Sequence, residues 1–263
     1  MLNKLEEYLK PQNVEEAWNM YSNKENALFL TGGLSVSLRE DNSTNVLIDL
    51  KNTLSKDISY DSDKLTIGGG VSVNELIDKA DDGLLKDSLK CIGSHQIRNM
   101  SSISGGIAQR YAWSDLISIL LGFDTEVELY NGDYALLPLE KYIEEKPVGI
   151  ICRIIIDNGF NYGKYFKFSR TTYDVSIFNT SIFLKCDGVV LQANIICGSR
   201  PAISKKLLES SDLLTGKKLP LTDSQFEDLF EIAVKEAQLR GNADASEEYR
   251  QKLLKSFLSK VLK

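Results

Sequence analysis

The sequence predicts an α+β fold, because segments with strand character and segments with helix character alternate along the chain. Over the first 157 residues, short apolar runs are bounded by turn-forming residues and alternate with stretches that carry helix-capping signals. Over the last hundred residues, one long strand pair joined by Asp187-Gly188 precedes three helical segments. Strands and helices grouped in this way are typical of α+β proteins.

The first elements are a helix and two strands. The side chain of Asn13 can accept a free amide of a first helical turn while Glu16 reaches back, which predicts a helix over 14–22. Strands are predicted at the apolar runs Ala27–Leu30 and Val46–Leu50, which a polar loop separates.

The next elements form another group of strands and helices. Lys64–Ile67 predicts a strand, and Ser72–Glu75 is a capping box that predicts a helix through Ala80. Ser114–Leu121 is apolar enough for a buried helix, and Val127–Gly132 ends in an Asn-Gly hairpin turn.

The last hundred residues begin with strands over Val175–Lys185 and Val189–Cys197. Cys186 and Cys197 could face each other across this hairpin, although a disulfide is the less favoured interpretation. Three helices are predicted to follow, and the last two cover Phe226–Ala237, after the cap Thr222, and Tyr249–Leu262.

Composition excludes several classes of function. The net charge of −6 and the lack of a basic run interleaved with aromatic residues argue against nucleic-acid binding. No apolar run approaches the roughly 20 residues that span a bilayer, and the acidic N-terminal segment is unlike a secretory signal, so we expect no membrane partner and a cytoplasmic location. The four cysteines lack C-x-x-C spacing, so no metal or iron–sulfur site is expected in this chain.

Two glycine turns are candidates for binding a phosphate group. Thr31-Gly32-Gly33-Leu34-Ser35 follows a predicted strand, and Ser102-Ile103-Ser104-Gly105-Gly106 lies about 70 residues further on. Successive backbone amides in such turns form a concave donor surface that neutralises a diphosphate without lysines. A plain turn remains the alternative for each segment taken alone.

Several segments, in one order, resemble a known family. Gln96–Ala108, followed by Asp115-Leu116, is similar to the FAD-binding pattern I-R-N-x-A-T-I-G-G-N-L-A of molybdenum hydroxylase flavoproteins. The first glycine turn resembles the A-G-G-x-S/D turn of that family, and Val46–Leu50 matches its V-L-I-D-L strand. Downstream, Tyr165–Asp174 resembles Y-x-K-x-x-R-x-x-x-D, and Ala243–Arg250 resembles D-x-x-A-S-x-x-Y-R.

The chain therefore resembles the medium, FAD-binding subunit of carbon monoxide dehydrogenase and xanthine dehydrogenase. The resemblance implies a two-subdomain FAD-binding fold of the vanillyl-alcohol-oxidase (PCMH) type followed by a C-terminal domain of antiparallel strands and helices. The domains are then expected at 1–56 and 57–158, the two FAD-binding subdomains, and at 159–263.

Residues at the matching positions are the implied FAD contacts. They are Leu30, Thr31, Gly32, Gly33, Leu34, Ser35, Val36, Ile92, Ser102, Ile103, Ser104, Gly105, Gly106, Asp115, Ile150 and Lys167.

Two of these residues carry specific implied roles. By resemblance, Asp115 bonds the adenosine part and Lys167 lies near the flavin or its diphosphate. The alternatives are a helix N-cap for Asp115 and a solvated strand residue for Lys167. For Arg170 and Asp174 we favour a structural ion pair with each other.

The chain departs from the family pattern at three positions. Ser104 stands where the family has the first glycine, and Gly106 stands where it has asparagine, so a side-chain amide contact to FAD is missing. Ile92 replaces an aromatic residue next to the flavin, so any stacking must come from a tyrosine such as Tyr111 or Tyr173.

No catalytic side chain is predicted, since flavin redox chemistry belongs to the cofactor. The single histidine, His95, is interpreted as a hydrogen-bonding loop residue.

The resemblance implies a partner large subunit that carries the molybdenum cofactor and a partner ferredoxin-like small subunit that carries two-iron two-sulfur clusters. Electrons would reach FAD in this chain and pass to NAD, within a possible dimer of heterotrimers. Two alternatives are a self-contained flavin oxidase of the same fold and a scaffold subunit whose flavin loops have decayed. The oxidase is disfavoured because we expect no separate substrate domain.

Overall fold

The computed structural model describes residues 5–37, 43–81 and 83–263. The chain forms two compact units. The first comprises residues up to Lys79 with Ser94–Gln109 and Thr125–Ile156, and the second comprises Ala80–Gly93, Arg110–Asp124 and Asp157–Lys263. Both units combine helices with sheets, which confirms the α+β prediction. The predicted boundaries near residues 56 and 158 stay predictions.

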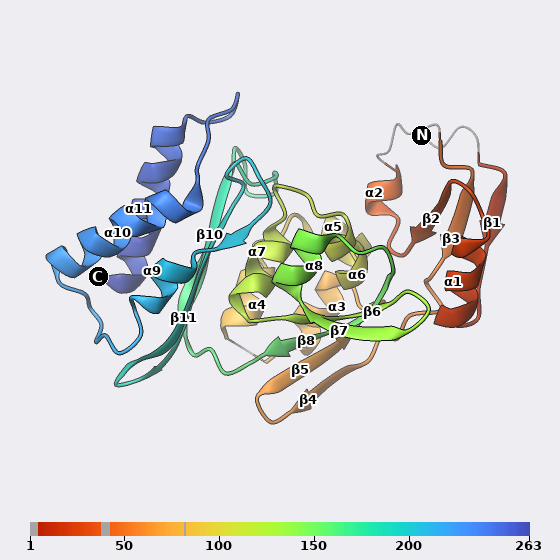
Figure 1. Ribbon diagram of the computed structural model, residues 1–263, viewed down its shortest axis with the longest axis horizontal. Helices are drawn as coiled ribbons and strands as arrows, with labels where there is room; N and C mark the ends of the chain where they lie inside the picture. The colour runs from red at the N-terminus through yellow and green to blue at the C-terminus, as the bar shows by residue number, and fades with distance from the viewer. Residues whose placement is uncertain (1–4, 38–42, 82) are drawn as a thin grey trace. The chain divides into compact units, whose positions relative to one another are not determined.

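In the described residues of the first unit, the strands form two sheets (Figure 1). A parallel sheet has the order β1-β3-β2, with β1 at Glu7–Leu9, β2 at Ala27–Leu30 and β3 at Val46–Asp49. A five-stranded sheet has the order β4-β5-β8-β6-β7, with β4 at Ile58–Asp61, β5 at Lys64–Gly68, β6 at Glu126–Tyr130, β7 at Tyr134–Pro138 and β8 at Ile150–Asp157.

Short helices accompany these sheets. They are α1 at Val14–Ser22, α2 at Leu34–Ser37, α3 at Val73–Lys79, α5 at His95–Met100, α6 at Ile103–Ala108 and α8 at Leu139–Glu145. Helix α1 is amphipathic, and its buried residue Ala17 packs in one cluster with Val46 and Ile48 of β3. This cluster fixes β3, and with it β2, whose carboxyl end leads into the first glycine turn.

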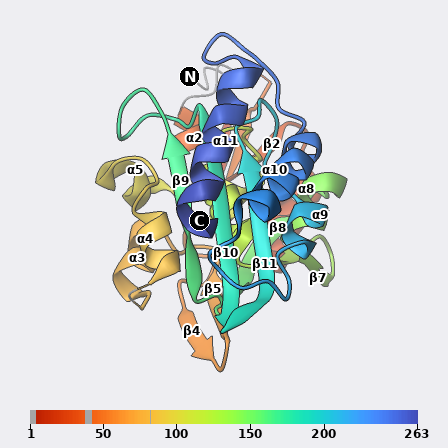
Figure 2. The same cartoon turned by 90° about the vertical axis from the view of Figure 1, so that its left-hand side faces the viewer.

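The second unit is one antiparallel sheet with helices on both faces, and Figure 2 looks onto one of these faces (Figures 1 and 2). The strand order is β12-β11-β10-β9, with β9 at Tyr162–Phe168, β10 at Phe178–Asp187, β11 at Val189–Gly198 and β12 at Lys205–Lys206. One face carries α9 at Leu208–Asp212, α10 at Asp223–Ala237 and α11 at Glu247–Leu262. The other face carries α4 at Leu84–Leu89 and α7 at Asp115–Gly122.

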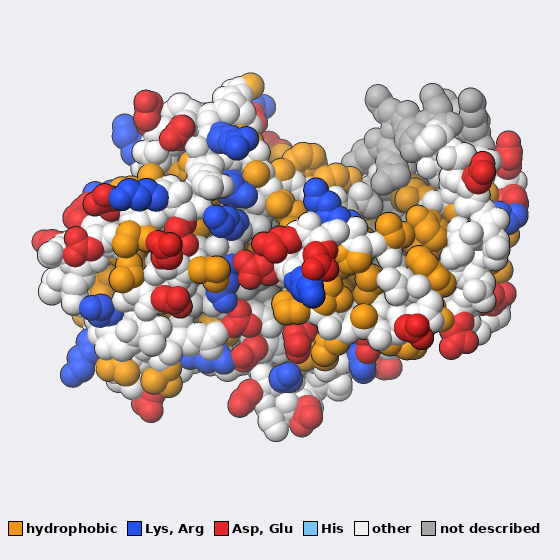
Figure 3. Space-filling view, in the orientation of Figure 1, with side chains coloured by type: hydrophobic (Ala, Val, Ile, Leu, Met, Phe, Trp, Pro, Cys, Tyr) orange, Lys and Arg blue, Asp and Glu red, His pale blue; other side chains and the backbone are white. Residues whose placement is uncertain are grey.

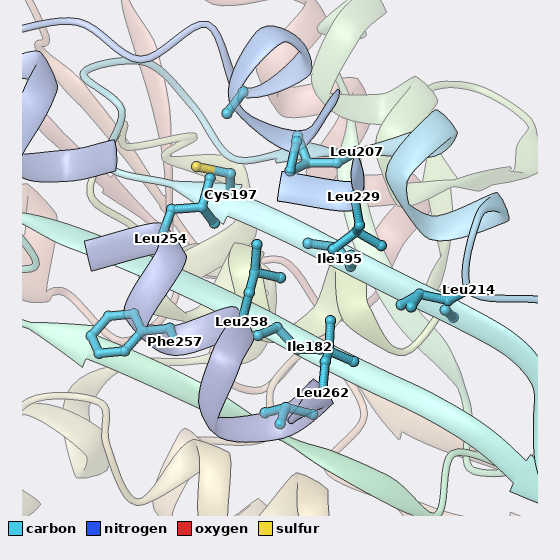
Figure 4. Packing of buried hydrophobic residues seen from close by; sticks show 14 of the residues in the cluster. Ile182, Ile195, Cys197, Leu207, Leu214, Leu229, Leu254, Phe257, Leu258 and Leu262 are labelled. Atoms are coloured by element: carbon cyan, nitrogen blue, oxygen red, sulfur yellow. The ribbon is translucent and has the colours of Figure 1, made fainter. Parts of the chain in front are cut away.

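The core of the second unit lies between the sheet and helices α10 and α11 (Figure 4). Ile182 of β10 and Ile195 of β11 are fully buried, and they meet Leu229, Leu254 and Leu258 of the two helices. Full burial of each such side chain contributes roughly 1.5–3 kcal/mol to the stability of the folded state. This packing explains why the C-terminal helices follow the hydrophobic spacing that the sequence shows.

Capping signals placed several helix starts correctly. The carboxamide of Asn13 accepts the N–H of Glu16 at 2.8 Å, and the Glu16 carboxylate reaches back to the N–H of Gln12 at 2.6 Å. Reciprocal bonds of the same kind join Ser72 with Glu75 and Thr222 with Gln225. These predictions were right because each cap depends on residues three or four positions apart.

Several other predictions were wrong. The segment predicted as the second turn is instead helix α6, with Ser102 as its N-cap, and His95 is the first residue of α5 rather than a loop residue. Asp115 is not a helix cap, because Ser114 caps α7.

The hairpin of the second unit also differs from its prediction. Strand β10 begins at Phe178, three residues after the predicted start. Cys186 lies opposite Val190 and Cys197 opposite Thr180, so the two thiols do not face each other, and both are free. Part of the polar loop predicted between the first two strands lies outside the described residues.

Acidic and basic side chains are intermingled over the described residues on the face shown in Figure 3. In the described part of the chain, no helix is both long enough and apolar enough to cross a membrane.

Candidate cofactor site

The first glycine turn follows strand β2 and needs both of its glycines. Gly33 has φ +83°, in the left-handed region that favours glycine. Gly32 is required for a different reason: a Cβ atom there would lie 1.7 Å from the carbonyl oxygen of Met100. The missing side chain lets this turn pack directly against the backbone of residues 100–102.

This close approach brings the two predicted motifs together within the first unit. The hydroxyl oxygens of Thr31 and Ser102, 71 positions apart in the sequence, lie 2.6 Å from each other. Gly105 completes the contact, because a Cβ there would lie 2.7 Å from Thr31 Oγ1 and 2.8 Å from Ser102 Oγ. The structure therefore joins two turns that the sequence shows only as separate segments.

The two motifs differ in the hydrogen-bond donors that they leave free. In the first turn of α6, Ile103 N–H donates to Val71 O, Ser104 N–H to Gly69 O and Gly105 N–H to Ser102 Oγ. Gly106 N–H donates to Ser102 O. By contrast, among the described residues no acceptor is bonded to the N–H of Gly32 or Gly33. The first turn therefore offers backbone N–H donors, and the second motif packs against this turn and supports it.

A cavity of about 120 Å³ opens where the motifs meet. Most of the predicted contacts of the first unit line it: Thr31, Gly32, Gly33, Leu34, Ser35, Val36, Ser102, Ser104, Gly105, Gly106 and Ile150. Leu30 and Ile103 do not line it; Leu30 ends β2, and Ile103 is the fully buried first residue of α6.

The cavity walls also include residues that were not among the predicted contacts. They are Phe29, Leu50, Leu54, Met100, Ser101, Ala108, Gln109, Gly149 and Ile151. No lysine or arginine among the described residues lines the cavity, so backbone and hydroxyl groups would have to meet an anion there.

Ser104 supplies an independent sign of a ligand. Its hydroxyl oxygen is buried and has no hydrogen-bond partner among the described residues, although the residue lines the cavity. Buried polar groups are usually bonded, so an unpartnered one at a cavity wall is typical of a site that holds a polar ligand.

The remaining predicted contacts belong to the second unit, where Asp115 is the centre of a buried cluster. Its Oδ1 accepts hydrogen bonds from Tyr165 Oη at 2.6 Å, from Asn179 Nδ2 at 3.2 Å and from Ser176 Oγ. Its Oδ2 lies 2.9 Å from Lys167 Nζ. Four donors thus occupy most of the accepting capacity of this carboxylate.

Lys167 is held in place by the same cluster. Its side chain is only 8% exposed, so it is not a solvated strand residue. Its ammonium also donates to the carbonyl of Cys91 at 3.4 Å, next to Ile92 at the end of the α4 segment. Burial, together with the Asp115 carboxylate, raises the pKa of Tyr165 well above its ordinary value, so its hydroxyl stays a proton donor.

Arg170 and Asp174 make other contacts than the predicted ion pair. Arg170 pairs with Asp244 at 2.6 Å, whereas the carboxylate of Asp174 accepts the N–H of Val175, so the predicted pair of Arg170 with Asp174 was wrong. The ring of Tyr111 stacks on that of Trp113, with centroids 4.7 Å apart.

Tyr173 and His95 are two further side chains that the sequence analysis considered. Tyr173 is 63% exposed. His95 faces the amide groups of Asn74 and Asn99 at 3.3 and 3.1 Å, as expected of a hydrogen-bonding residue.

Solved structures show the same fold over nearly the whole chain. A carbon monoxide dehydrogenase from Hydrogenophaga pseudoflava, which lacks the Mo-pyranopterin moiety of its cofactor, matches with a TM-score of 0.86 at 20% identity, covering 100% of this chain and 97% of that one. Reconstituted CO dehydrogenase from Oligotropha carboxidovorans matches with a TM-score of 0.87 at 18% identity, covering 99% and 97%.

Quinoline 2-oxidoreductase from Pseudomonas putida 86 matches with a TM-score of 0.83 at 17% identity, covering 97% and 95%. In sequence, the uncharacterized protein YgfM of Escherichia coli (strain K12) is 24% identical over 181 residues, which are 68% of this chain and 69% of that protein.

Family comparison covers both parts of the chain. Residues 164–263 match the CO dehydrogenase flavoprotein C-terminal domain. Residues 3–156, more than half of the chain, match the FAD binding domain in molybdopterin dehydrogenase, and the chain therefore belongs to this family of FAD-binding flavoproteins of molybdenum hydroxylases.

Proposed function

We propose that this chain takes electrons from iron–sulfur clusters of a partner subunit through bound FAD and delivers them to NAD. The observation that carries the proposal is the cavity between the two glycine motifs. Among the described residues it offers backbone N–H donors and a Ser104 hydroxyl without a hydrogen-bond partner, and no basic side chain lines it. Such a neutral donor surface suits a diphosphate.

The residues present fit one part of the cofactor. A volume of about 120 Å³ is below the roughly 300–1,000 Å³ of sites that enclose a whole drug-sized ligand, so this cavity suits the diphosphate and its neighbouring ribitol. The N–H groups of Gly32 and Gly33 would bind phosphate oxygens. The apolar walls, with Ile150 among them, would exclude water. When bound, FAD supplies the electron-accepting chemistry.

In the second unit, Ile92, Asp115 and Lys167 remain proposed contacts. The ion pair with Asp115 fixes the ammonium of Lys167 against the Cys91 carbonyl and prevents it from rotating freely. We propose that Lys167 meets an anionic part of the cofactor, while Asp115 acts mainly by holding Lys167, because most of its accepting sites are already occupied.

Membership of the family supports a proposal for the partner subunits. We propose a large subunit that holds the molybdenum cofactor and oxidises the substrate, and a ferredoxin-like small subunit with two-iron two-sulfur clusters. A dimer of such heterotrimers is the proposed assembly. The names of the structural relatives, CO dehydrogenase and quinoline 2-oxidoreductase, are consistent with oxidation of a small molecule elsewhere in the complex.

An absorbance spectrum of the purified chain tests cofactor binding. We expect flavin bands at close to one FAD per chain, either as purified or after incubation with FAD. Protein that stays colourless with saturating FAD would support the decayed scaffold and contradict the proposal.

Anaerobic addition of NADH tests the acceptor. Because electron transfer is reversible, NADH should bleach the flavin bands if the nicotinamide site lies on this subunit. Co-purification of tagged chain with a molybdenum subunit and an iron–sulfur subunit tests the assembly. An isolated chain that oxidises a small molecule with oxygen at full rate would favour the flavin oxidase instead.

A further inference from the structure

The hydroxyl groups of Thr31 and Ser102 carry two hydrogens, and the hydrogen bond between them occupies only one. The two oxygens are 2.6 Å apart, so one hydroxyl donates to the other. Each hydroxyl has a single donor hydrogen. Gly105 N–H donates to Ser102 Oγ at 3.2 Å and adds no hydroxyl hydrogen to the count. One O–H donor therefore remains without an acceptor among the described residues.

Either hydroxyl can donate in this pair, and the more exposed Thr31 is the better position for the spare hydrogen. Ser102 is 6% exposed and caps α6, whereas Thr31 is only partly buried and lies on the side of the pair toward the glycine turn. When Ser102 donates to Thr31, the Thr31 hydroxyl can donate to an acceptor in the cavity that both residues line. The N–H groups of Gly32 and Gly33, which have no acceptor among the described residues, follow directly in the chain.

Three adjacent donors, in a cavity that no described lysine or arginine lines, suit an acceptor with several oxygens. We propose that the Thr31 hydroxyl donates a hydrogen bond to a phosphate oxygen of the dinucleotide cofactor. Threonine stands here where the family pattern has alanine. The inference rests on the proposed binding of the FAD diphosphate in this cavity.

Thr31→Val tests the contact, since valine keeps the shape of threonine without the hydroxyl. Removing one hydrogen bond to a charged oxygen should raise the Kd for FAD about ten-fold, measured by calorimetric titration of flavin-free protein. The Kd for ADP, which contains the diphosphate, should rise by a similar factor, and riboflavin, which has no phosphate, should bind unchanged. Thr31→Ser, which keeps a hydroxyl, should bind FAD within about two-fold of the unmodified chain.

Thr66→Val on β5 is the matched control, because it makes the same chemical change in the same unit away from this cavity. It should leave all three affinities unaltered. Ser102→Ala is unsuitable, because it also removes the cap of α6. Thermal unfolding of the flavin-free variants checks that Thr31→Val folds like the unmodified chain.

The possible failures are distinguishable. An unmodified chain that binds FAD while Thr31→Val binds it equally well would overturn the Thr31 contact and leave the proposed function in place. A weakening of riboflavin binding equal to that of ADP would also overturn it, because the loss would not concern phosphate. An unmodified chain that binds no FAD would overturn the proposed function and this inference together.

Discussion

At the scale of single residues, replacing Gly32 and replacing Gly33 should lower the free energy of unfolding for different reasons. Gly32→Ala would drive Cβ into the carbonyl oxygen of Met100, at 1.7 Å, and this backbone atom cannot move aside as a side chain can. We expect the first turn to separate from the second motif, with a loss of about 1–3 kcal/mol in the free energy of unfolding. Urea denaturation measures this loss, and the Kd for FAD should rise with it.

Gly33→Ala and Gly216→Ala are the matched comparison. These glycines have φ +83° and +79°, and only Leu30 Cδ1, at 3.7 Å, is near the Cβ that would be added at Gly33. Both variants should lose roughly 1–2 kcal/mol from backbone conformation alone. If Gly32→Ala loses no more stability or FAD affinity than Gly216→Ala, the close packing of the motifs is not what the site requires.

Asp115 and Lys167 give a second prediction for individual side chains. Asp115→Asn leaves the buried ammonium of Lys167 without a counter-charge and can turn an amide donor toward it. Breaking one side of a buried pair typically costs about 3–5 kcal/mol. We expect this loss in urea denaturation. Combining Asp115→Asn with Lys167→Met should recover part of it, because the unpaired charge is then gone.

An Asp115→Asn variant as stable as the unmodified chain would contradict the structural role of the pair. A double variant that is less stable than Asp115→Asn would mean that Lys167 stabilises the unit through contacts other than this ion pair.

At the scale of elements, the segment Ala243–Arg250 joins helix α11 to the loop before it. Ser246 caps the helix through the N–H of Tyr249. The buried guanidinium of Arg250 then donates to the carbonyl groups of Ser199, Arg240 and Ala245 and to the side chain of Asn242. The family-like motif here has a structural explanation, with no cofactor contact needed.

Arg250→Lys should therefore destabilise the second unit. A lysine ammonium is one point donor and cannot span acceptors that the guanidinium reaches with three separate nitrogens. Leaving buried carbonyl groups unbonded should cost about 2 kcal/mol or more in chemical denaturation. Arg170→Lys is the control, since its pair with Asp244 is exposed and worth about 0–1 kcal/mol. Equal losses of stability in Arg250→Lys and Arg170→Lys would contradict the view that the Arg250 guanidinium stabilises the second unit by bonding several carbonyl groups.

Local signals explain which elements could be predicted from the sequence. The starts of α1, α3 and α10 depend on caps three or four residues long, and each was correctly located. Helix α6 was missed because Ile103–Ala108 contains serine and two glycines, which are poor helix formers. It forms because Ile103 and Ile107 are buried and because Val71 and Gly69 accept its first amides. These tertiary contacts leave no local trace.

The candidate site likewise combines motifs that the sequence could locate with contacts that only the folded structure shows. The resemblance located the two motifs, but not that Gly32 packs on Met100 or that the first amides of α6 are already bonded. Phe29, Leu50 and Ile151 line the cavity from strands or strand ends and look like ordinary core residues in the sequence. The partners Ser176 and Asn179 of Asp115 lie 61 and 64 positions away, so no spacing rule could have indicated them.

At the scale of the whole molecule, each unit carries a thiol whose ionisation opposes folding. Burial raises the pKa of Cys152 in the first unit and of Cys197 in the second to about 12, from an ordinary value of 9.0. Cys197 is fully buried, and Cys152 is partly exposed, so Cys197 should have the larger effect.

Stability should consequently fall in alkaline solution. Below pH 9 both the folded and the unfolded chain keep the Cys197 proton. As the pH rises from 9 toward 12, the unfolded chain loses that proton while the folded chain retains it, so the free energy of unfolding declines by about 1.4 kcal/mol per pH unit for this thiol. Urea denaturation with a reductant at each pH measures the slope. Cys197→Ala is less stable at neutral pH because it leaves a small cavity, but its decline above pH 9 should be shallower by that amount. Parallel declines in the two proteins would show that the buried thiol ionises in the folded state as readily as in the unfolded one.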